Sequence, residues 1–337
     1  MRYPDFLIKG DKIGVTAPSD GNKKETDFAR LDNAKDKLEK LGFPVIETAS
    51  VRKSEKGRSA EGKIRAAELM SLVENPEVKA IVSAKGGDFL CEMLPFLDYE
   101  KINQYPKWYQ GYSDNTGLVF PITTKYDIAT IYGNNFNDFG MAQWHESVIN
   151  NFEILKGNLL EQASFDFYED GFYDKETGLE GYQKDKPVEW KISGTASEVM
   201  MKGRLLGGCL DVLLDMVGTK YEDVAGFNER YASEGVLWYL ESFDLGSEAL
   251  TRALWHLREA GWFSKANGFI FGRPCMFNTF TDTSYEEAVL SVLGDLGKPI
   301  ILQADIGHKA PQFTMINGAY GTVWCSGGKG KLRMELK

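Results

Sequence analysis

Apolar residues in the first 160 positions follow two alternating spacings. Short apolar runs, typical of buried strands, occupy residues 12–19, 44–48, 78–84 and 107–113. Between these runs, apolar residues recur at helical spacing, for example at Phe28, Leu31, Ala34, Leu38 and Leu41. Strands that alternate with helices predict right-handed βαβ units and a parallel sheet covered on both faces.

The pattern changes between residues 161 and 195, where the chain is polar, aromatic and interrupted by glycine. Strand candidates then return at residues 204–209, 236–241, 268–274 and 299–308, and residues 312–337 suggest a closing β-hairpin. We therefore predict an α/β protein with three parts. These are a parallel-sheet N-terminal domain (1–160), a linker with short strands (161–195) and a smaller, β-rich α/β C-terminal domain (196–337).

Composition narrows the classes of partner. The 337 residues are 43% apolar, 26% charged and 12% aromatic, as in a globular protein. The net charge of −10 argues against nucleic acids and anionic membranes, because both bind basic surfaces. No signal region opens the sequence, and no apolar run approaches the ~20 residues that span a bilayer. We expect a cytoplasmic protein with no membrane partner.

Cysteine and histidine spacing gives no indication of a metal or a cofactor. The four cysteines are far apart and never form Cys-x-x-Cys, so we expect reduced thiols instead of a zinc site or disulfides. The three histidines are His145, His256 and His308, and none belongs to a His-Glu-x-x-His pair. We expect the protein to need neither a metal nor a cofactor.

The segment Gly111-Tyr112-Ser113-Asp114-Asn115 follows an aromatic strand run. Its form is close to the nucleophile elbow Gly-x-Ser-x-Gly, in which a strand turns sharply into a helix and exposes a serine. Asn115 replaces the last glycine, and asparagine also tolerates a left-handed backbone. Ser113 is therefore a candidate nucleophile. An ordinary serine in a turn is the alternative.

Two further reactive residues directly follow apolar strand runs, namely Glu241 and His308. In open α/β folds, sites gather beyond the carboxyl ends of strands, so Ser113, Glu241 and His308 form a candidate set. Serine needs a base, which His308 can supply, and the imidazole needs an orienting acid, which Glu241 can supply. Taken singly, Glu241 could be an acid at a strand end and His308 a structural residue.

Acyl transfer also requires donors for the oxyanion. Gly86-Gly87 offers exposed backbone N–H groups after the third strand, and the N–H of Asp114 offers another. A tight turn or a phosphate loop is the alternative for the two glycines. The pattern is not Gly-x-Gly-x-x-Gly, and no Walker lysine follows, so nucleotide binding through that motif is disfavoured.

These residues together resemble a known family. The elbow Gly111-Tyr112-Ser113-Asp114-Asn115-Thr116, the upstream Gly86-Gly87, the strand-end Glu241 and the pair Gly307-His308 are similar to the LD-carboxypeptidase family of serine peptidases. That family includes the microcin C immunity peptidases. The resemblance covers nearly the whole chain, from residue 9 to the Gly307-His308 segment.

The resemblance implies a Ser-Glu-His triad of Ser113 as nucleophile, Glu241 as orienting carboxylate and His308 as general base and acid. It also implies a flavodoxin-like N-terminal domain, an active site between the two domains and a homodimer. Family members cleave the amide between an L- and a D-amino acid in murein tetrapeptides. Members of the immunity branch cleave an aminoacyl–nucleotide amide instead.

Several features look more like the immunity branch, including the Ser-Asp-Asn-Thr continuation of the elbow. In that branch an aromatic residue from the linker stacks on the nucleobase, and Trp190 is the candidate here, with a core or interface tryptophan as the alternative. Cys209 and Cys275 stand where the family often has an asparagine and an acid. If both line the pocket with Gly86, the substrate has fewer polar contacts.

The resulting hypothesis is a serine carboxypeptidase of small peptide-like amides, with an aminoacyl-nucleotide conjugate as substrate. A murein tetrapeptide LD-carboxypeptidase is an alternative within the enzyme class. A non-catalytic binding module for a nucleotidyl peptide and a flavodoxin-like cofactor or regulatory protein are alternatives from other classes.

Overall fold

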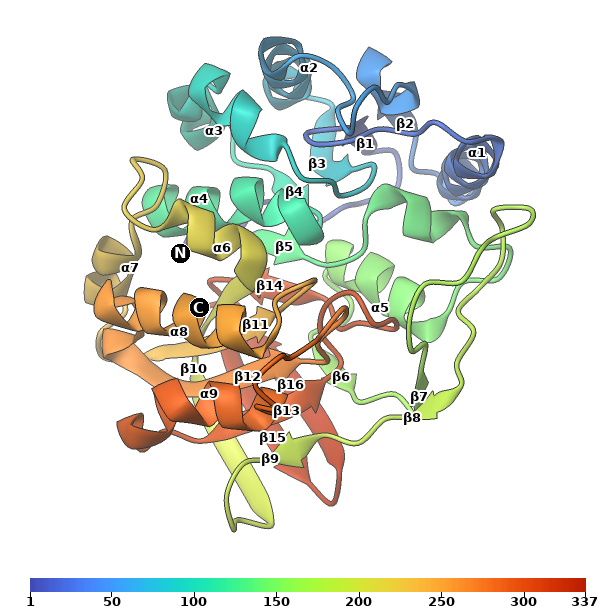
Figure 1. Cartoon of the computed structure of the whole chain (residues 1–337). Helices are drawn as coiled ribbons and strands as arrows, with labels where there is room; N and C mark the ends of the chain where they lie inside the picture. Colours follow the sequence, from blue (N-terminus) through green and yellow to red (C-terminus); the bar gives the residue numbers. More distant parts are fainter. The chain divides into compact units, whose positions relative to one another are not determined.

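The computed structural model describes all 337 residues, and its chain groups into two units (Figure 1). Unit 1 contains Met1–Leu159 and Tyr173–Tyr182, and unit 2 contains Leu160–Phe172 and Gln183–Lys337. The segment 161–195 therefore contributes residues to both units.

Five short parallel strands form the sheet of unit 1. They are β1 (Lys12–Thr16), β2 (Val45–Glu47), β3 (Val78–Ser83), β4 (Trp108–Gln110) and β5 (Thr130–Tyr132). Their order in the sheet is β2-β1-β3-β4-β5. This is the flavodoxin-like order, so the predicted parallel α/β fold is confirmed for this unit. The strands are almost wholly buried, which explains their continuous apolar sequences.

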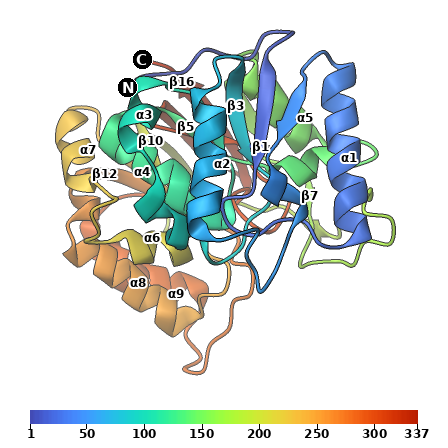
Figure 2. The same cartoon turned by 90° about the horizontal axis from the view of Figure 1, so that it is seen from above.

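Helices cover both faces of this sheet. They are α1 (Glu25–Lys40), α2 (Gly62–Glu74), α3 (Tyr99–Gln104), α4 (Thr116–Tyr126) and α5 (Glu146–Leu155), with 3₁₀ turns η1 (Ala49–Arg52), η2 (Leu90–Phe96), η3 (Ser113–Asn115) and η4 (Phe136–Gly140). Helices α1 and α5 lie on one side of the sheet and α2 and α3 on the other (Figures 1 and 2). The buried face of α1 carries Leu31, Ala34 and Leu38, as their helical spacing predicts.

Unit 2 is built on a mixed eight-stranded sheet. Its parallel centre consists of β10 (Glu198–Cys209), β11 (Val236–Glu241), β12 (Ala266–Gly272) and β13 (Ile300–Ala304). Antiparallel strands flank this centre, with β15 (Tyr320–Ser326), β16 (Lys329–Glu335) and β6 (Glu161–Ala163) beyond β10, and β9 (Lys191–Ile192) beyond β13. Strands β7 (Phe167–Tyr168) and β8 (Lys186–Pro187) pair separately, and β14 (Met315–Asn317) precedes β15.

The helices of unit 2 are α6 (Leu210–Met216), α7 (Val224–Arg230), α8 (Ser247–Glu259) and α9 (Tyr285–Leu293), with 3₁₀ turns η5 (Trp262–Lys265) and η6 (Gly294–Leu296). Helices α8 and α9 lie side by side (Figures 1 and 2). The predicted closing hairpin is β15–β16, whose turn contains Gly327 and Gly328 at φ +56° and +75°. Two successive left-handed residues suit a tight hairpin, and glycine adopts them without steric cost.

The strand order of unit 1 identifies where its loops converge. The strand order reverses between β1 and β3, because β2 lies on one side of β1 and the later strands lie on the other. In such folds ligands bind beyond the carboxyl ends of the strands at this point. The loops that leave β1, β3 and β4 carry Ser19, Gly86-Gly87 and Ser113. The fold therefore directs three candidate segments to the same edge of the sheet.

None of the helices combines the length and hydrophobicity that a membrane crossing requires.

Candidate functional site

Ser113 occupies a sharp turn between β4 and α4. The strand ends at Gln110, three residues earlier than its apolar pattern predicts, and Ser113 opens the 3₁₀ turn η3. Ser113 has φ +65°, a left-handed conformation that costs a non-glycine residue about 1–3 kcal/mol. Asn115, whose residue type also tolerates a left-handed backbone, is instead helical, with φ −62°. The strain is therefore concentrated on the candidate nucleophile, as in a nucleophile elbow.

Several contacts hold this turn in place. The Ser113 N–H donates to the Tyr132 hydroxyl at 3.3 Å, and the Ser113 carbonyl accepts from the Thr116 hydroxyl at 2.8 Å. The Asn115 amide donates to the carbonyls of Tyr112 (3.0 Å) and Lys85 (3.1 Å). Because Lys85 follows β3, Asn115 ties the elbow to the neighbouring Gly86-Gly87 loop.

The Gly86-Gly87 loop passes directly beside Ser113. A Cβ atom added at Gly86 would lie 2.9 Å from both Cβ and Oγ of Ser113, closer than real Cβ atoms approach other atoms. Gly87 has φ +154°, and a Cβ there would lie 2.4 Å from the Ser19 hydroxyl. Glycine at position 86 therefore lets the loop backbone approach Ser113, and glycine at position 87 lets it approach Ser19.

The side chain of Asp114, which the sequence pattern did not single out, anchors this arrangement. Its carboxylate accepts from the Ser19 hydroxyl and, at 2.9 Å, from the Leu90 N–H. Burial raises the pKa of the Asp114 carboxyl, although these two hydrogen bonds oppose the rise. The Ser19 hydroxyl in turn accepts from the Phe89 N–H at 3.2 Å. The loops after β1, β3 and β4 are thus joined through Ser19 and Asp114.

Glu241 and His308 form a buried pair in unit 2. Glu241 ends β11, and its Oε2 lies 2.9 Å from Nδ1 of His308, in the loop after β13. Their side chains are 0% and 6% exposed. Burial lowers the pKa of His308, but the charge of Glu241 and its hydrogen bond outweigh burial, so the pKa is raised above 6.5. The carboxylate thus fixes which ring nitrogen faces Glu241 and orients the imidazole.

Two glycines let the histidine loop approach Glu241. Gly307 has φ +92°, and a Cβ there would lie 2.5 Å from Cγ and Oε2 of Glu241. A Cβ at Gly272, the last residue of β12, would lie 2.2 Å from the Ile306 carbonyl oxygen and 3.0 Å from Cβ of Glu241. The sequence signal for this contact was the dipeptide Gly307-His308, and the role of Gly272 was missed.

Cys209 and Cys275 both lie near Glu241. Cys209 ends β10 in register with Glu241, and the Cys275 N–H donates to the Ser242 carbonyl at 3.1 Å. Burial, followed by the charge of Glu241, raises the pKa of Cys209 and raises that of Cys275 to about 11. Both side chains are therefore neutral thiols at neutral pH.

Trp190 does not offer a ring face for stacking in this structure. The residue is 3% exposed, its Nε1 donates to Asp305 at 2.9 Å, and its ring packs 5.5 Å from that of Phe313. A Cβ added at Gly330 would lie 2.1 Å from the indole. The core interpretation of Trp190 therefore replaces the substrate-contact prediction.

An exposed aromatic residue that sequence reasoning missed, Phe172, contacts a ring that packs on the histidine. Phe172 is 60% exposed, and its ring lies 6.1 Å from that of Phe243. The ring of Phe243 lies 4.7 Å from the imidazole of His308. Phe172 belongs to the aromatic segment at 165–173, but the segment gives no local signal that separates Phe172 from its neighbours.

The structure thus yields two local sets of predicted residues. Within unit 1 it brings together Ser113, Asp114, Gly86 and Gly87. Within unit 2 it brings together Glu241 and His308, with Cys209 and Cys275 near the carboxylate. No group of three or more His, Cys, Asp or Glu side chains is arranged to hold a metal ion.

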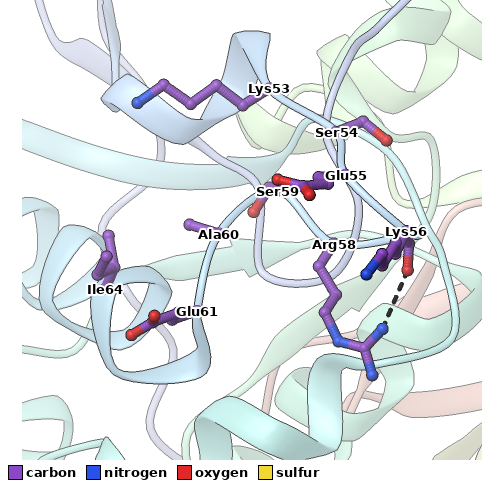
Figure 3. Close-up of a pocket in the computed structure, with 9 residues that line it drawn as sticks. All are labelled: Lys53, Ser54, Glu55, Lys56, Arg58, Ser59, Ala60, Glu61 and Ile64. Atoms are coloured by element: carbon purple, nitrogen blue, oxygen red, sulfur yellow. Dashed lines mark hydrogen bonds between the residues drawn. The ribbon is translucent and has the colours of Figure 1, made fainter.

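A surface pocket of about 720 Å³ lies elsewhere on unit 1 (Figure 3). It is lined by Lys53, Ser54, Glu55, Lys56, Arg58, Ser59, Ala60, Glu61 and Ile64. The Arg58 guanidinium donates to the Lys56 carbonyl at 3.0 Å and pairs with Glu92 at 2.6 Å. The lining carries charges of both signs and none of the predicted site residues, so the pocket is not part of the predicted site.

Both halves of the chain match domains of a known protein family, and related sequences occur in several bacteria. Residues 13–133 match the LD-carboxypeptidase N-terminal domain, and residues 202–323 match the LD-carboxypeptidase C-terminal domain. A Vibrio cholerae protein that carries the name carboxypeptidase is 29% identical over 96% of this chain and 95% of its own. The Escherichia coli microcin C7 self-immunity protein MccF is 37% identical over 130 residues, which are 38% of this chain and 37% of MccF.

The fold is also that of a solved protein. The structure of MccF in complex with aspartyl sulfamoyl adenosine superposes with a TM-score of 0.82 over 100% of this chain and 99% of that chain, at 24% identity. The similarity confirms the predicted fold class, an α/β protein with a parallel-sheet N-terminal part and a second, β-rich α/β part. The second unit is about as large as the first, whereas the sequence pattern predicts a smaller one.

Proposed function

Because the chain belongs to the LD-carboxypeptidase family, we propose that it is a serine peptidase that cleaves a small peptide-like amide, with an aminoacyl-nucleotide conjugate as its substrate. The observation that carries this proposal is the left-handed Ser113 at the end of β4, with Gly86 packed against its hydroxyl. A strained serine in a tightly fixed turn is the arrangement that exposes a nucleophile.

In the proposed reaction, Ser113 Oγ attacks the scissile carbonyl carbon while His308 Nε2 accepts the hydroxyl proton. Glu241 holds Nδ1 of the imidazole at 2.9 Å and stabilises the imidazolium that forms. The N–H groups of Gly87 and Asp114 stabilise the oxyanion, and each such donor is typically worth about 10²–10³ in turnover.

The tetrahedral intermediate then collapses and the carbon–nitrogen bond breaks. His308 returns its proton to the departing amine, which leaves the acyl group as an ester on Ser113. Water attacks this ester with His308 again acting as the base, and the carboxylic acid product leaves. The cycle ends with Ser113 and His308 in their starting states.

The substrate proposal draws on MccF, whose solved structures include complexes with aspartyl sulfamoyl adenosine and with glutamyl sulfamoyl guanosine. The exposed Phe172, next to Phe243 and His308, is an aromatic surface on which a nucleobase could stack in this chain. The net charge of −10 disfavours long anionic partners such as nucleic acids, but it does not oppose one small conjugate.

A comparison of two substrates tests the proposal. The purified protein is offered a murein tetrapeptide and an aspartyl sulfamoyl adenosine in parallel reactions, with Ser113→Ala as the matched control. We expect cleavage of the aminoacyl-nucleotide amide by the wild type and a loss of more than about 10⁴-fold in the variant. Preferred cleavage of the murein peptide would instead favour the murein carboxypeptidase alternative.

Covalent labelling separates catalysis from simple binding. A fluorophosphonate should acylate Ser113 in the wild type and leave Ser113→Ala unlabelled, because the probe reacts only with an activated serine. Tight, stoichiometric binding of the conjugate without labelling of Ser113 would favour the non-catalytic binding module. Near-normal hydrolysis by Ser113→Ala would contradict the assignment of the nucleophile.

A further inference from the structure

Arg273 is a buried arginine at the base of the histidine loop. It directly follows Gly272, the last residue of β12, and is 2% exposed. One of its terminal nitrogens, Nη1, pairs with Asp305 Oδ1 at 2.8 Å and donates to the Gln303 carbonyl at 3.3 Å. A buried guanidinium is costly unless its charge and its N–H groups are matched, and Asp305 provides the opposite charge.

The other terminal nitrogen contacts the far arm of the same loop, which is the part that follows His308. Arg273 Nη2 donates to the carbonyls of Lys309 (3.0 Å) and Pro311 (3.2 Å). Gln303 belongs to the near arm, which precedes His308, so His308 lies in the sequence between the two parts of the loop that Arg273 contacts. The planar guanidinium therefore binds the loop before and after the histidine, which a single-point cation such as lysine cannot do with the same geometry.

Asp305 is itself fixed on its second oxygen. Its Oδ2 accepts from Trp190 Nε1 at 2.9 Å and from the Phe165 N–H at 3.3 Å. The guanidinium also lies over the ring of Tyr168, 4.4 Å from its centroid. The indole N–H of Trp190 therefore donates a hydrogen bond that orients the Asp305 carboxylate.

We propose that Arg273 is a positioning residue for the imidazole, because it holds both arms of the 303–311 loop and so fixes His308 against Glu241. The inference rests on the proposed function, in which His308 is the general base. Arg273 does not touch the reacting atoms in this assignment. It acts through the loop that carries His308.

The chain offers a matched control in Arg204. This arginine is also buried (3% exposed) in unit 2, pairs with Glu234 at 2.9 Å and donates to the Gly318 carbonyl at 2.8 Å. Its guanidinium lies 4.4 Å from the ring centroid of Tyr231. Arg204 therefore has the same kinds of contact as Arg273, but it makes them with Glu234, Gly318 and Tyr231 and not with Gln303, Lys309 or Pro311.

The test compares Arg273→Lys with Arg204→Lys in the full-length protein. The first readout is hydrolysis of aspartyl sulfamoyl adenosine, and the second is an NMR titration of His308, which is one of three histidines in the chain. For Arg273→Lys we expect kcat to fall about 10²-fold with KM little changed, because a small displacement of a catalytic group has that effect. We expect Arg204→Lys to leave kcat within a factor of two.

The titration reports on position without relying on activity. The groups that raise the pKa of His308 are the carboxylates of Glu241 and Asp211, which oppose the effect of burial. If Arg273→Lys loosens the loop, the His308 pKa should fall toward 6.5, whereas Arg204→Lys should leave it unchanged. An unchanged kcat and an unchanged His308 pKa in Arg273→Lys would overturn the proposal, as would equal effects in the two variants.

A second variant serves if Arg273→Lys does not fold. Tyr168→Leu removes the ring beneath the guanidinium and keeps every hydrogen bond of Arg273, so the expected changes have the same direction and are smaller. Its matched control is Tyr231→Leu. Unchanged kcat and His308 pKa in Tyr168→Leu would overturn the proposal in that case.

The two proposals can fail separately. A wild-type protein that hydrolyses neither test substrate would contradict the proposed function, while a lowered His308 pKa in Arg273→Lys would still support the positioning role. Conversely, an active enzyme in which Arg273→Lys changes neither readout would overturn the positioning role alone.

Discussion

At the scale of single residues, His308 experiences two opposing influences. Burial favours its neutral form, whereas the carboxylate of Glu241, 2.9 Å from Nδ1, favours the imidazolium and prevails. A general base must be neutral, so activity is expected to rise with pH as His308 loses its proton. Since the pKa is raised, the acid limb of kcat/KM should lie above pH 6.5.

Glu241→Gln tests this electrostatic account. The substitution removes the charge that raises the pKa of His308, so the acid limb should move to lower pH while kcat falls by about 10⁴. Glu234→Gln, which removes an acid paired with Arg204 in the same unit, is the control and should leave the limb in place. The pH profile of kcat/KM is the measurement. An unchanged acid limb in Glu241→Gln would contradict the assignment of His308 as the titrating base.

Phe172 provides a second test at the residue scale. Its ring is exposed next to Phe243, which packs on His308, so Phe172→Ala should weaken binding of the nucleoside part of the substrate. Stacking of a base on an aromatic ring is worth about 1–3 kcal/mol, which corresponds to a rise in KM of roughly 5- to 150-fold. Phe167→Ala, at a second exposed aromatic of the same segment, is the control. Steady-state kinetics that give an equal KM for Phe172→Ala and wild type would exclude this contact.

At the scale of elements, local sequence patterns predicted the buried strands β1 to β4 and β10 to β13, helix α1 and the turn that carries Ser113, but not the short helix α7. They did so because a buried strand needs a continuous apolar run, and a strand-to-helix turn needs small and polar residues. The pattern did not predict that Ser113 itself, and not Asn115, takes the left-handed backbone. The backbone conformation of Ser113 is held by hydrogen bonds with Tyr132 and Thr116. Tyr132 belongs to another element, β5, so this contact is not visible in the local sequence.

Local sequence patterns also do not predict contacts between distant segments of the chain. Ser19 and Asp114 are 95 positions apart, and their hydrogen bond follows from the order of β1, β3 and β4 in the sheet. Trp190 is a stacking candidate only through the family resemblance, which implies that an aromatic residue of the linker contacts the nucleobase. Its burial follows from contacts with Phe313 and Asp305, more than 100 positions further along the chain.

The glycine loop after β3 gives the prediction that belongs to this scale. In Gly86→Ala, the new methyl group would lie 2.9 Å from Ser113 Oγ, so the loop or the serine must move. Because φ of Gly86 is not in the left-handed region, backbone strain does not contribute. We expect kcat to fall about 10²-fold with little change in the melting temperature.

Gly181→Ala is the matched control for this steric effect. An added Cβ at Gly181 meets no atom within 4 Å, and this residue also lacks a positive φ. Activity and melting temperature should both remain at the wild-type level. If Gly86→Ala retained full activity, the proposed closeness of the oxyanion loop to the nucleophile would be contradicted.

At the scale of the whole molecule, the proposed reaction draws on both units of the chain. The hydroxyl of Ser113 belongs to unit 1, and the pair Glu241–His308 belongs to unit 2. The chain alternates between the units, since residues 173–182 belong to unit 1 and the segments on either side belong to unit 2. In the proposal, each chain supplies its own complete triad, and the predicted homodimer is not needed to complete it.

Mixing two inactive variants tests this property. Ser113→Ala retains His308, and His308→Ala retains Ser113, so a site shared between two copies would be restored in a mixture. We expect no hydrolysis of aspartyl sulfamoyl adenosine by the mixture, and no fluorophosphonate labelling of Ser113 in His308→Ala, because the serine then lacks its base. The variants are unfolded and refolded together so that any dimer can exchange, with refolded wild type as the control. Recovery of activity in the mixture would mean that Ser113 of one copy works with His308 of another, and the single-chain triad would have to be abandoned.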